Sequence, residues 1–514
     1  MELWKEPFKV TVEVKLSGKN TEDTGHTTVV RTCILFLLSG EYRMWQVCLK
    51  RHLGKRRESD MGEKKELKKN LGVATAMALV VGCVIGSGVF FKPQAIYTAT
   101  GGAPGLGMIA WIITGLASIA AALTFAEVAI MIPKTGGMVA YLEEIYNPVV
   151  GFLAGWVQTI LFYPAMISAL AVVCAQQAAL FIGDGFTVPL AIGIIILVVF
   201  LNSLGSKVGG GIQVVFTVCK LIPLVLLMIF GFVKGGGANP IFSPMVGDGL
   251  NPAVVLGQLM VAILFAFEGW TGVGAIAGEM KNPSRDLPIA IVGGVSVIMG
   301  VYFVINIAYL WVLPASELAT LTAPASAVAL KVFGDIGGKI ISVGIMVSVF
   351  GACNGFLLSG SRVAYSLAAE GNFPFSKTLA KINNAQVPAN SIILVGAIGS
   401  IYAISGQFNL LTDLAVFSSW MFYTLTFIGV MKLRKDQPDA ERSYKVPLYP
   451  IVPIIAVVSG VYVIINQLFM AGLQSTLLSV GSIIIMIIGL PVYTVVKNNK
   501  VKKKTASNGE KMLT

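Results

Sequence analysis

Charged residues and histidine are scarce in this 514-residue sequence. Asp, Glu, Lys and Arg together make up 12% of it, about half the share with which a soluble protein covers its surface. A large soluble enzyme is therefore excluded. Only two histidines occur, His26 and His52, both near the N-terminus. The rest of the sequence holds no histidine-based metal centre or catalytic triad and no nucleotide-binding loop. We expect neither an enzyme nor a bound metal or cofactor.

Cysteine is also sparse, with six residues in the whole chain. Four of them lie within apolar segments, and no two are spaced like a metal-binding pair. We therefore expect these four to be small packing residues and not a disulfide framework. They are Cys83, Cys174, Cys219 and Cys353.

Long apolar segments, by contrast, recur along the chain. Hydrophobic residues make up 55% of the sequence, and the mean hydropathy is +0.79. Because a helix of about 20 apolar residues crosses about 30 Å of hydrocarbon, the pattern predicts an all-α integral membrane protein with twelve transmembrane helices. The predicted spans are residues 71–98, 106–132, 149–182, 187–204, 211–233, 254–280, 288–313, 338–368, 390–405, 409–432, 451–470 and 475–496.

Lysine and arginine distinguish the two sides of these spans. Nearly all of them fall before the first span, after the even-numbered spans and in the C-terminal tail. The opposite side holds only Lys92, Lys234, Lys331 and Lys339. Since cytoplasmic loops carry the excess of positive charge, both termini are predicted to be cytoplasmic, in a plasma membrane protein. The net charge of +12 follows mostly from this bias and requires no nucleic-acid partner.

The spans divide the chain into five predicted parts. Residues 1–70 form a cytoplasmic extension, of which 1–60 are either dispensable or a regulatory tail. Residues 71–233 and 254–432 form two halves of five spans each, with opposite topology. The last two spans occupy 451–496, and 497–514 form a basic tail that can rest on anionic lipid.

Glycine interrupts the first span of each half at mid-depth. The first span contains GCVIGSGVFFKP (82–93) and the sixth contains FAFEGWTGVGAIAGE (265–279). An unpartnered backbone group in hydrocarbon costs several kcal/mol, so a broken helix persists only where it is buried or lines a cavity. Matched interruptions in inverted halves are typical of a transporter substrate site. The alternative is that these glycines allow close helix packing.

Broken helices offer both kinds of backbone group to a ligand. Freed N–H groups favour a carboxylate, and freed carbonyls favour an ammonium, so an amino acid zwitterion suits such a site. Around Gly86, the N–H groups of Ser87 and Gly88 and the Ser87 hydroxyl are predicted to bind the carboxylate. The predicted acceptors for the amino group are the carbonyls of Val84, Ile85, Phe265, Ala266 and Glu268.

The same residues resemble a known family. GCVIGSGVF is similar to the glycine-rich first-helix motif of the amino acid–polyamine–organocation superfamily. Further matches are IPKTGGMVAYLEEIY (132–146), FAFEGW (265–270), GEMKNPSRDLPIAI (278–291), GKIISVGIMVSVFGACNG (338–355), SRVAYSLAAEGNFP (361–374) and YKVPLYPIVPI (444–454). The pattern resembles the L-type amino acid transporter group and, within it, the bacterial serine/threonine exchangers. The resemblance implies a LeuT-like 5+5 inverted repeat plus two C-terminal helices, alternating access, and sodium-independent exchange of neutral amino acids.

The resemblance also implies roles for single residues. Ser87 and Gly88 match the carboxylate-binding positions, and Phe265 matches the aromatic gate that closes over substrate from outside. Lys220, in VFTVCKLIPL (215–224), matches the fifth-helix lysine of the superfamily. Its ammonium would replace a sodium ion and could carry a proton. The alternative is that Lys220 extends to the cytoplasmic interface.

For other polar and aromatic residues in the spans, the sequence leaves more than one role open. Glu268 either contacts a polar substrate side chain, binds a proton, or makes a structural hydrogen bond. Glu127 either joins an inner gate with Lys134 or Arg362 or forms an ordinary interfacial ion pair, and Trp270 either lines the site or packs. The loop at 183–188 lacks the cysteine that bonds eukaryotic relatives to a heavy subunit, so no disulfide-linked heavy subunit is expected.

These observations favour an amino acid transporter that exchanges neutral L-amino acids, either serine and threonine or larger ones. A proton-coupled amino acid symporter is the alternative within transport. An amino acid sensor that does not transport is the alternative of another class.

Overall fold

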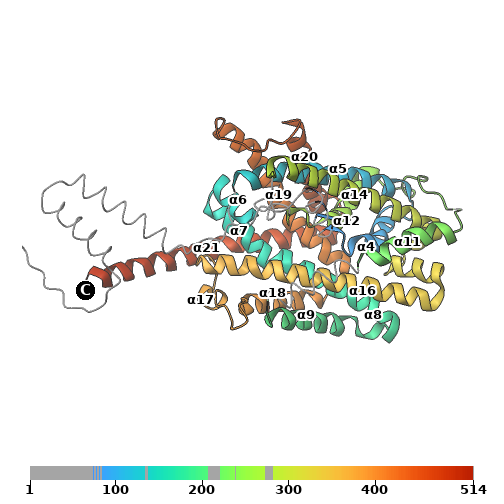
Figure 1. Ribbon diagram of the computed structural model, residues 1–514, viewed down its shortest axis with the longest axis horizontal. Helices are drawn as coiled ribbons and strands as arrows, with labels where there is room; N and C mark the ends of the chain where they lie inside the picture. The colour runs from blue at the N-terminus through green and yellow to red at the C-terminus, as the bar shows by residue number, and fades with distance from the viewer. Residues whose placement is uncertain are drawn as a thin grey trace, which may run out of the picture. The chain divides into compact units, whose positions relative to one another are not determined.

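The fold is all-helical, as the sequence predicts. A computed structural model describes residues 73, 77, 80, 81, 84–132, 137–205, 220–237, 239–272 and 282–512, and within these ranges every regular element is a helix (Figure 1). Seven described helices are long and apolar enough to cross a membrane, and four apolar helices are shorter.

The described helical elements differ widely in length, from three residues in η2 and η3 to 46 in α16. In chain order they are α4 (Gly88–Ala99), α5 (Gly105–Met131), α6 (Met138–Ile145), α7 (Pro148–Val157), η1 (Gln158–Phe162), α8 (Tyr163–Ile182), η2 (Asp184–Phe186), α9 (Thr187–Ser203), α11 (Leu221–Lys234), α12 (Pro252–Phe267), η3 (Trp270–Gly272), α14 (Pro283–Val312), α15 (Ala315–Leu318), α16 (Pro324–Ala369), α17 (Ser376–Leu379), α18 (Ala389–Ala403), α19 (Phe408–Asp436), α20 (Ile451–Phe469) and α21 (Leu473–Met512).

Most predicted spans have a helical counterpart. Three of them, 71–98, 211–233 and 254–280, run into residues outside the described ranges, and the other nine coincide with helices. Two boundaries differ. A separate helical stretch precedes the predicted span at 338–368, because Gly334 takes φ +75° inside α16, and α21 continues to Met512 instead of ending at 496. The count of twelve stays a prediction.

Equivalent helices of the two predicted halves pack on one another. The first and sixth spans meet through α4 and α12, and the second and seventh through α5 and α14. The third and eighth meet through α8 and α16, and the fourth and ninth through α9 and α18. The last two helices lie against the outside of this arrangement, where α20 packs on α5, α12 and α19, and α21 packs on α7, α19 and α20.

The third span is also locally broken, which we did not predict from the sequence. Residues 158–162 form one π-helical turn between α7 and α8. Such turns leave backbone groups out of the regular ladder and often mark functional sites. Here the Tyr402 hydroxyl on α18 donates to the carbonyl of Ile160 at 3.0 Å, so the neighbouring helix satisfies the widened turn.

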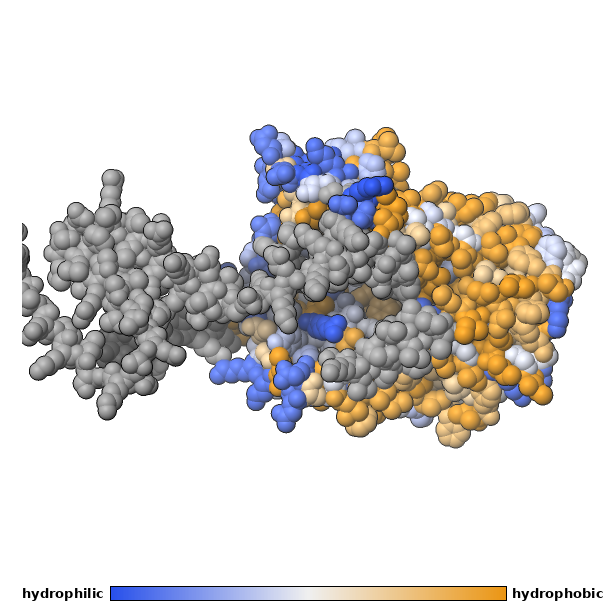
Figure 2. All heavy atoms as spheres, viewed as in Figure 1, coloured by the Kyte–Doolittle hydropathy of each residue, from blue (hydrophilic) through white to orange (hydrophobic). Residues whose placement is uncertain are grey.

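Apolar side chains cover much of the outside of the helices. Phe200 on α9, Val233 on α11 and Val458 on α20 are exposed, a pattern that soluble proteins avoid over large areas and that lipid contact explains. In Figure 2, hydrophobic residues cover most of the helical body, whereas hydrophilic residues gather mainly at the end that carries α17 and the connection at 437–450.

Candidate functional site

The predicted break in the first span is present. The chain is helical at Val84, leaves the helix at Ile85, bends at Gly86 and Ser87, and begins α4 at Gly88. The Ile85 amide still donates to the Val81 carbonyl at 3.0 Å. Ser87 is 2% exposed, and its side chain makes no capping hydrogen bond to α4. The Ser87 hydroxyl is therefore buried at the break without serving to cap its own helix.

The predicted break in the sixth span is present as well. α12 ends at Phe267, Glu268 is extended (φ −62°, ψ +142°), and Gly269 takes φ +120° before the 3₁₀ turn η3. This left-handed conformation strains any residue with a Cβ atom, so Gly269 is the residue that permits the break. Two further glycines of the motif, Gly274 and Gly278, lie outside the described residues.

The two breaks meet directly. A Cβ atom added to Gly88 would lie 2.5 Å from both the Cα and the Cβ atom of Ala266, so only glycine allows α4 to approach α12 this closely. The hydroxyl of Tyr302 on α14 donates to the Ala266 carbonyl at 2.9 Å and lies 3.3 Å from the Val84 carbonyl. One side chain therefore connects both breaks.

This contact bears on the predicted ammonium site. Of the five proposed carbonyls, those of Val84 and Ala266 both lie within hydrogen-bond distance of the Tyr302 hydroxyl, which can donate to one of them at a time, and that of Phe265 accepts the Glu268 amide at 3.2 Å. A carbonyl oxygen has two lone pairs, so each can accept a second donor. The ammonium site stays a prediction, with Tyr302 added as the side chain that positions it.

Replacing Tyr302 with phenylalanine should weaken amino acid binding and lower stability by about 1–3 kcal/mol, because the buried Ala266 carbonyl loses its donor. The aromatic ring, which packs on Trp111 and Phe267 at centroid distances of 5.3 and 5.4 Å, is retained. Binding of labelled amino acid and the melting temperature of the purified protein measure the two effects.

Tyr309 provides the matched control for this prediction. It lies on the same helix, is also fully buried, and its hydroxyl has no hydrogen-bond partner among the described residues. Tyr309→Phe should therefore leave binding and stability almost unchanged. If both variants bind amino acid as the unmodified protein does, Tyr302 does not position the breaks.

Phe265, the predicted gate, lies under a buried cation that the sequence reasoning missed. The Lys92 ammonium, on α4 one turn after Gly88, is 5.2 Å from the ring centroids of both Phe265 and Phe408. These two rings pack edge to face at 5.5 Å. Lys92 is fully buried and packs against the Phe265 ring. If this ring swings away to open the gate, the Lys92 ammonium must therefore move as well.

Polar groups of α19 hold the Lys92 ammonium in place. It donates to the Thr412 hydroxyl at 2.6 Å and the Asn409 side-chain oxygen at 3.3 Å, and it pairs with Asp413 at 3.6 Å. From the sequence, Lys92 counted only as one of four charges on the outer side. Its position inside the first span, together with Asp413 in the tenth, was the available signal for this pair.

Glu268 lies at the break of the sixth span and contacts α19. The Tyr423 hydroxyl donates to its Oε1 at 2.7 Å, and no described residue is a hydrogen-bond partner of the buried Oε2. Trp270 packs on Phe125 and Tyr423, with ring centroids 5.4 and 5.2 Å apart. Trp270 therefore packs, while its place in the lining of the site stays a prediction, and Glu268 retains one oxygen for a further donor.

Lys220 is buried directly before α11. Residues 206–219, which include the preceding part of its predicted span, lie outside the described residues. The proposed role of its ammonium in place of a sodium ion stays a prediction.

Glu127, near the end of α5, binds partners that differ from those expected. Its carboxylate accepts two hydrogen bonds from Arg434, at 2.8 and 2.7 Å, and one from the Val446 amide at 2.7 Å. The Arg442 Nε atom lies 3.7 Å away. We refer to these four groups as the Glu127 cluster. Of the expected partners, Arg362 is exposed and Lys134 lies outside the described residues.

The Glu127 cluster joins three segments of the chain. Arg442 also donates to the carbonyls of Leu433 and Gln437, at 3.0 and 2.7 Å, and so covers the end of α19. Tyr444 donates to the Leu123 carbonyl of α5 at 3.4 Å. Burial, together with the Glu127 carboxylate, raises the pKa of Tyr444, which keeps its hydroxyl protonated as a donor.

Comparison with known proteins identifies similar sequences over nearly the whole predicted membrane body. Residues 71–496 match the family model described as amino acid permease. The chain is 38% identical over 442 residues to the serine/threonine exchanger SteT of Bacillus subtilis, covering 85% of this chain and 99% of that one. It is 30% identical over 433 residues to the human b(0,+)-type amino acid transporter 1, covering 80% and 86%. Its identity to the cystine/glutamate transporter of Pongo abelii is 25% over 443 residues.

Proposed function

Since the chain belongs to the amino acid permease family of the amino acid–polyamine–organocation superfamily, we propose that it exchanges small neutral L-amino acids, serine and threonine first, without sodium. It is a multi-pass membrane transporter and not an enzyme. We place it in the plasma membrane with both termini in the cytoplasm, and we assign alternating access as its mechanism.

The meeting of the two helix breaks carries this proposal. Gly88 and Ala266 are in contact, and the Tyr302 hydroxyl lies against one carbonyl of each break. An amino acid presents a carboxylate and an ammonium a few ångströms apart, and the two breaks supply a partner for each. The carboxylate would bind Ser87 and Gly88, and the ammonium would bind the five carbonyls named above, those of Val84, Ile85, Phe265, Ala266 and Glu268.

The packing of equivalent helices supports a LeuT-like inverted repeat of twelve spans. Pairing of the first with the sixth span, and of the next three with their counterparts, is what two halves related by an axis in the membrane plane produce. The two additional C-terminal helices, α20 and α21, lie outside this repeat. Alternating access would then move one group of helices against the other around the breaks.

The position of Glu268 favours the proposal that the substrate carries a hydroxyl group. One of its oxygens is buried and has no described donor, and it lies next to Ala266 and Phe265, whose carbonyls belong to the proposed site. A serine or threonine hydroxyl could donate to this oxygen. The similar Bacillus subtilis protein is named as a serine/threonine exchanger, whereas the proposal of larger neutral substrates has no such feature in its favour.

The same carboxyl group supports the second candidate, proton-coupled symport. A buried carboxyl that faces a substrate site can bind and release a proton during transport. Lys220 would occupy the place of a sodium ion in either mechanism. No disulfide-linked heavy subunit is proposed, because residues 183–188 contain no cysteine.

Proteoliposomes that contain the purified protein distinguish these mechanisms. For an exchanger, uptake of labelled serine requires internal serine or threonine and is unchanged when choline replaces sodium. For a symporter, an imposed pH gradient drives uptake into vesicles without internal amino acid. Uptake that depends on sodium would contradict the proposal, and no flux under any condition would indicate a sensor.

The Glu268→Gln variant tests the role of the carboxyl group. We expect its preference for serine over alanine to fall by roughly tenfold, since the lost hydrogen bond contributes about 1–2 kcal/mol. Competition of the two amino acids against labelled threonine measures the preference. Glu317→Gln, at an exposed carboxylate on α15, serves as the control. An unchanged preference in Glu268→Gln would exclude contact between this residue and the substrate hydroxyl.

A further inference from the structure

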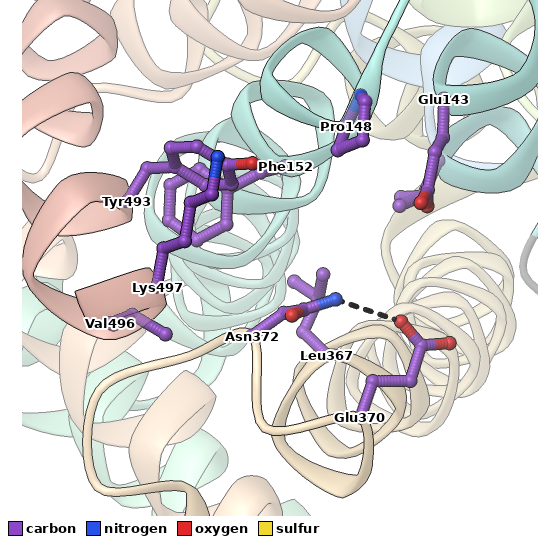
Figure 3. Close-up of a pocket in the computed structure, with 10 residues that line it drawn as sticks. Glu143, Pro148, Phe152, Leu367, Glu370, Asn372, Tyr493, Val496 and Lys497 are labelled. Carbon is purple, nitrogen blue, oxygen red and sulfur yellow. Dashed lines mark hydrogen bonds between the residues drawn. The ribbon is translucent and has the colours of Figure 1, made fainter. Parts of the chain in front are cut away.

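A cavity lies away from the helix breaks. It has a volume of about 210 Å³ and lies between α6, α7, the end of α16 and α21. The residues around it include Glu143, Phe152, Glu370, Asn372, Tyr493 and Lys497 (Figure 3). Its volume is smaller than that of ordinary drug-binding pockets, about 300–1,000 Å³, so it suits a small polar group.

The cavity lies at the ends of three candidate membrane spans. Pro148 begins one span, another ends at Ala369, and a third ends at Asn498, and residues at or next to all three ends line the cavity. Span ends lie at the depth of the lipid headgroups. The lysine-rich flank of the last span indicates the cytoplasmic leaflet.

Opposite charges line opposite sides of the cavity. Glu143 and Glu370 lie on one side in Figure 3, and the Asn372 amide donates to Glu370 Oε2 at 3.1 Å. On the other side Lys497 lies along Tyr493, with its ammonium 5.8 Å from the ring centroid, and Phe152 packs on Tyr493 at 5.2 Å. Carboxylates on one side and an ammonium on the other suit a ligand whose own cation is next to an anion.

We propose that this cavity binds the phosphoethanolamine headgroup of a phospholipid from the cytoplasmic leaflet. The primary ammonium lies between Glu143 and Glu370, where its three N–H groups find acceptors. The phosphate lies near Lys497. The acyl chains run past Leu490, which lies one turn before Tyr493 on the same side of α21 and is 41% exposed.

The charges also determine which headgroups bind poorly. An anionic headgroup without a cation would face two carboxylates. A choline headgroup has no N–H donor for those carboxylates, and the Tyr493 ring that could receive its quaternary ammonium is already covered by Lys497. A free amino acid carries the same two charges, but it lacks the chains that α21 would hold.

Thermal unfolding of the full-length protein in detergent, with and without added lipid, tests the proposal. We expect short-chain phosphatidylethanolamine to raise the melting temperature more than phosphatidylcholine or phosphatidylglycerol does. In the double variant Glu143→Gln/Glu370→Gln, about tenfold more phosphatidylethanolamine should be needed for the same shift. The double variant Glu317→Gln/Asp335→Asn removes two exposed carboxylates elsewhere and should respond as the unmodified protein does.

Two further measurements complete the test. Glycerophosphoethanolamine, which has no chains, should stabilise the protein less than the lipid, and an equal effect would indicate a soluble zwitterion instead. If the double variant fails to fold, Lys497→Gln alone should weaken the response to phosphatidylethanolamine. Equal responses of the unmodified protein and the variants, or a stronger effect of phosphatidylglycerol, would overturn the proposal. Neither result depends on the transported substrate.

Discussion

Replacing Gly88 with leucine is expected to abolish amino acid binding while the protein still inserts into the membrane. Even the first side-chain carbon would lie 2.5 Å from the Cα and Cβ atoms of Ala266. The Cα atom belongs to the backbone of α12 and cannot move aside as a flexible side chain would. The two breaks must therefore separate, and the carboxylate site loses the N–H groups that depend on their contact.

Binding and folding are measured separately for this variant. Scintillation proximity with labelled serine reports binding, and size-exclusion chromatography in detergent reports whether the protein is folded and monodisperse. Gly88→Ala should give an intermediate loss, because overpacking by one methyl group costs about 1–3 kcal/mol. Transport at the unmodified rate by Gly88→Leu would refute the assignment of the substrate site.

Gly300 on α14 offers the matched control. A Cβ atom there would have no neighbour within 4 Å, so Gly300→Leu places the same side chain in a membrane helix without a clash. We expect binding close to that of the unmodified protein. A loss of binding in both variants would mean that leucine at any glycine of these helices is disruptive, and that Gly88 is not special.

The breaks could be predicted from the sequence because their causes are local. A glycine cluster within a long apolar segment is visible in one stretch of about ten residues, and matched positions in two halves follow from counting spans. Nine spans were located for the same reason. The π-helical turn at 158–162 also has a local cause, which was missed: Pro164 follows it and has no N–H to donate to the Ile160 carbonyl.

Partners far apart in sequence could not be predicted in this way. Lys92 pairs with Asp413, and Tyr302 connects Val84 with Ala266, and both depend on which helices pack together. Lys134 and Arg362 were predicted as partners of Glu127 only because all three residues lie on the same predicted side of the membrane. The observed partner Arg434 requires in addition that the end of α19 lie beside α5, which charge counting does not supply.

Replacing Glu127 with glutamine should destabilise the protein by about 3–5 kcal/mol, because it leaves two buried or partly buried arginines without their carboxylate. Glu127 is 1% exposed, and the side chains of Arg434 and Arg442 are 19% and 5% exposed. This is not the ordinary exposed ion pair that the sequence left open, whose contribution is about 0–1 kcal/mol. The melting temperature in detergent measures the loss.

The exposed pair of Lys339 and Asp335, 3.0 Å apart on α16, gives the control. Asp335→Asn should change the melting temperature little, and a similar loss in both variants would contradict a special role of the Glu127 cluster.

Exchange kinetics then separate a gate from a purely structural contact. The Glu127 cluster joins the end of α5 to the end of α19 and to residues 437–450, so its loss should allow these segments to part. If the cluster closes the inner side during each cycle, Glu127→Gln changes the maximal exchange rate of the folded fraction at saturating serine, with a smaller effect on KM. If it only stabilises the fold, the folded fraction exchanges serine at the unmodified rate. Charge reversal of both partners, Glu127→Arg with Arg434→Glu, should restore stability only in part, because Arg442 and the Val446 amide still require a carboxylate at position 127.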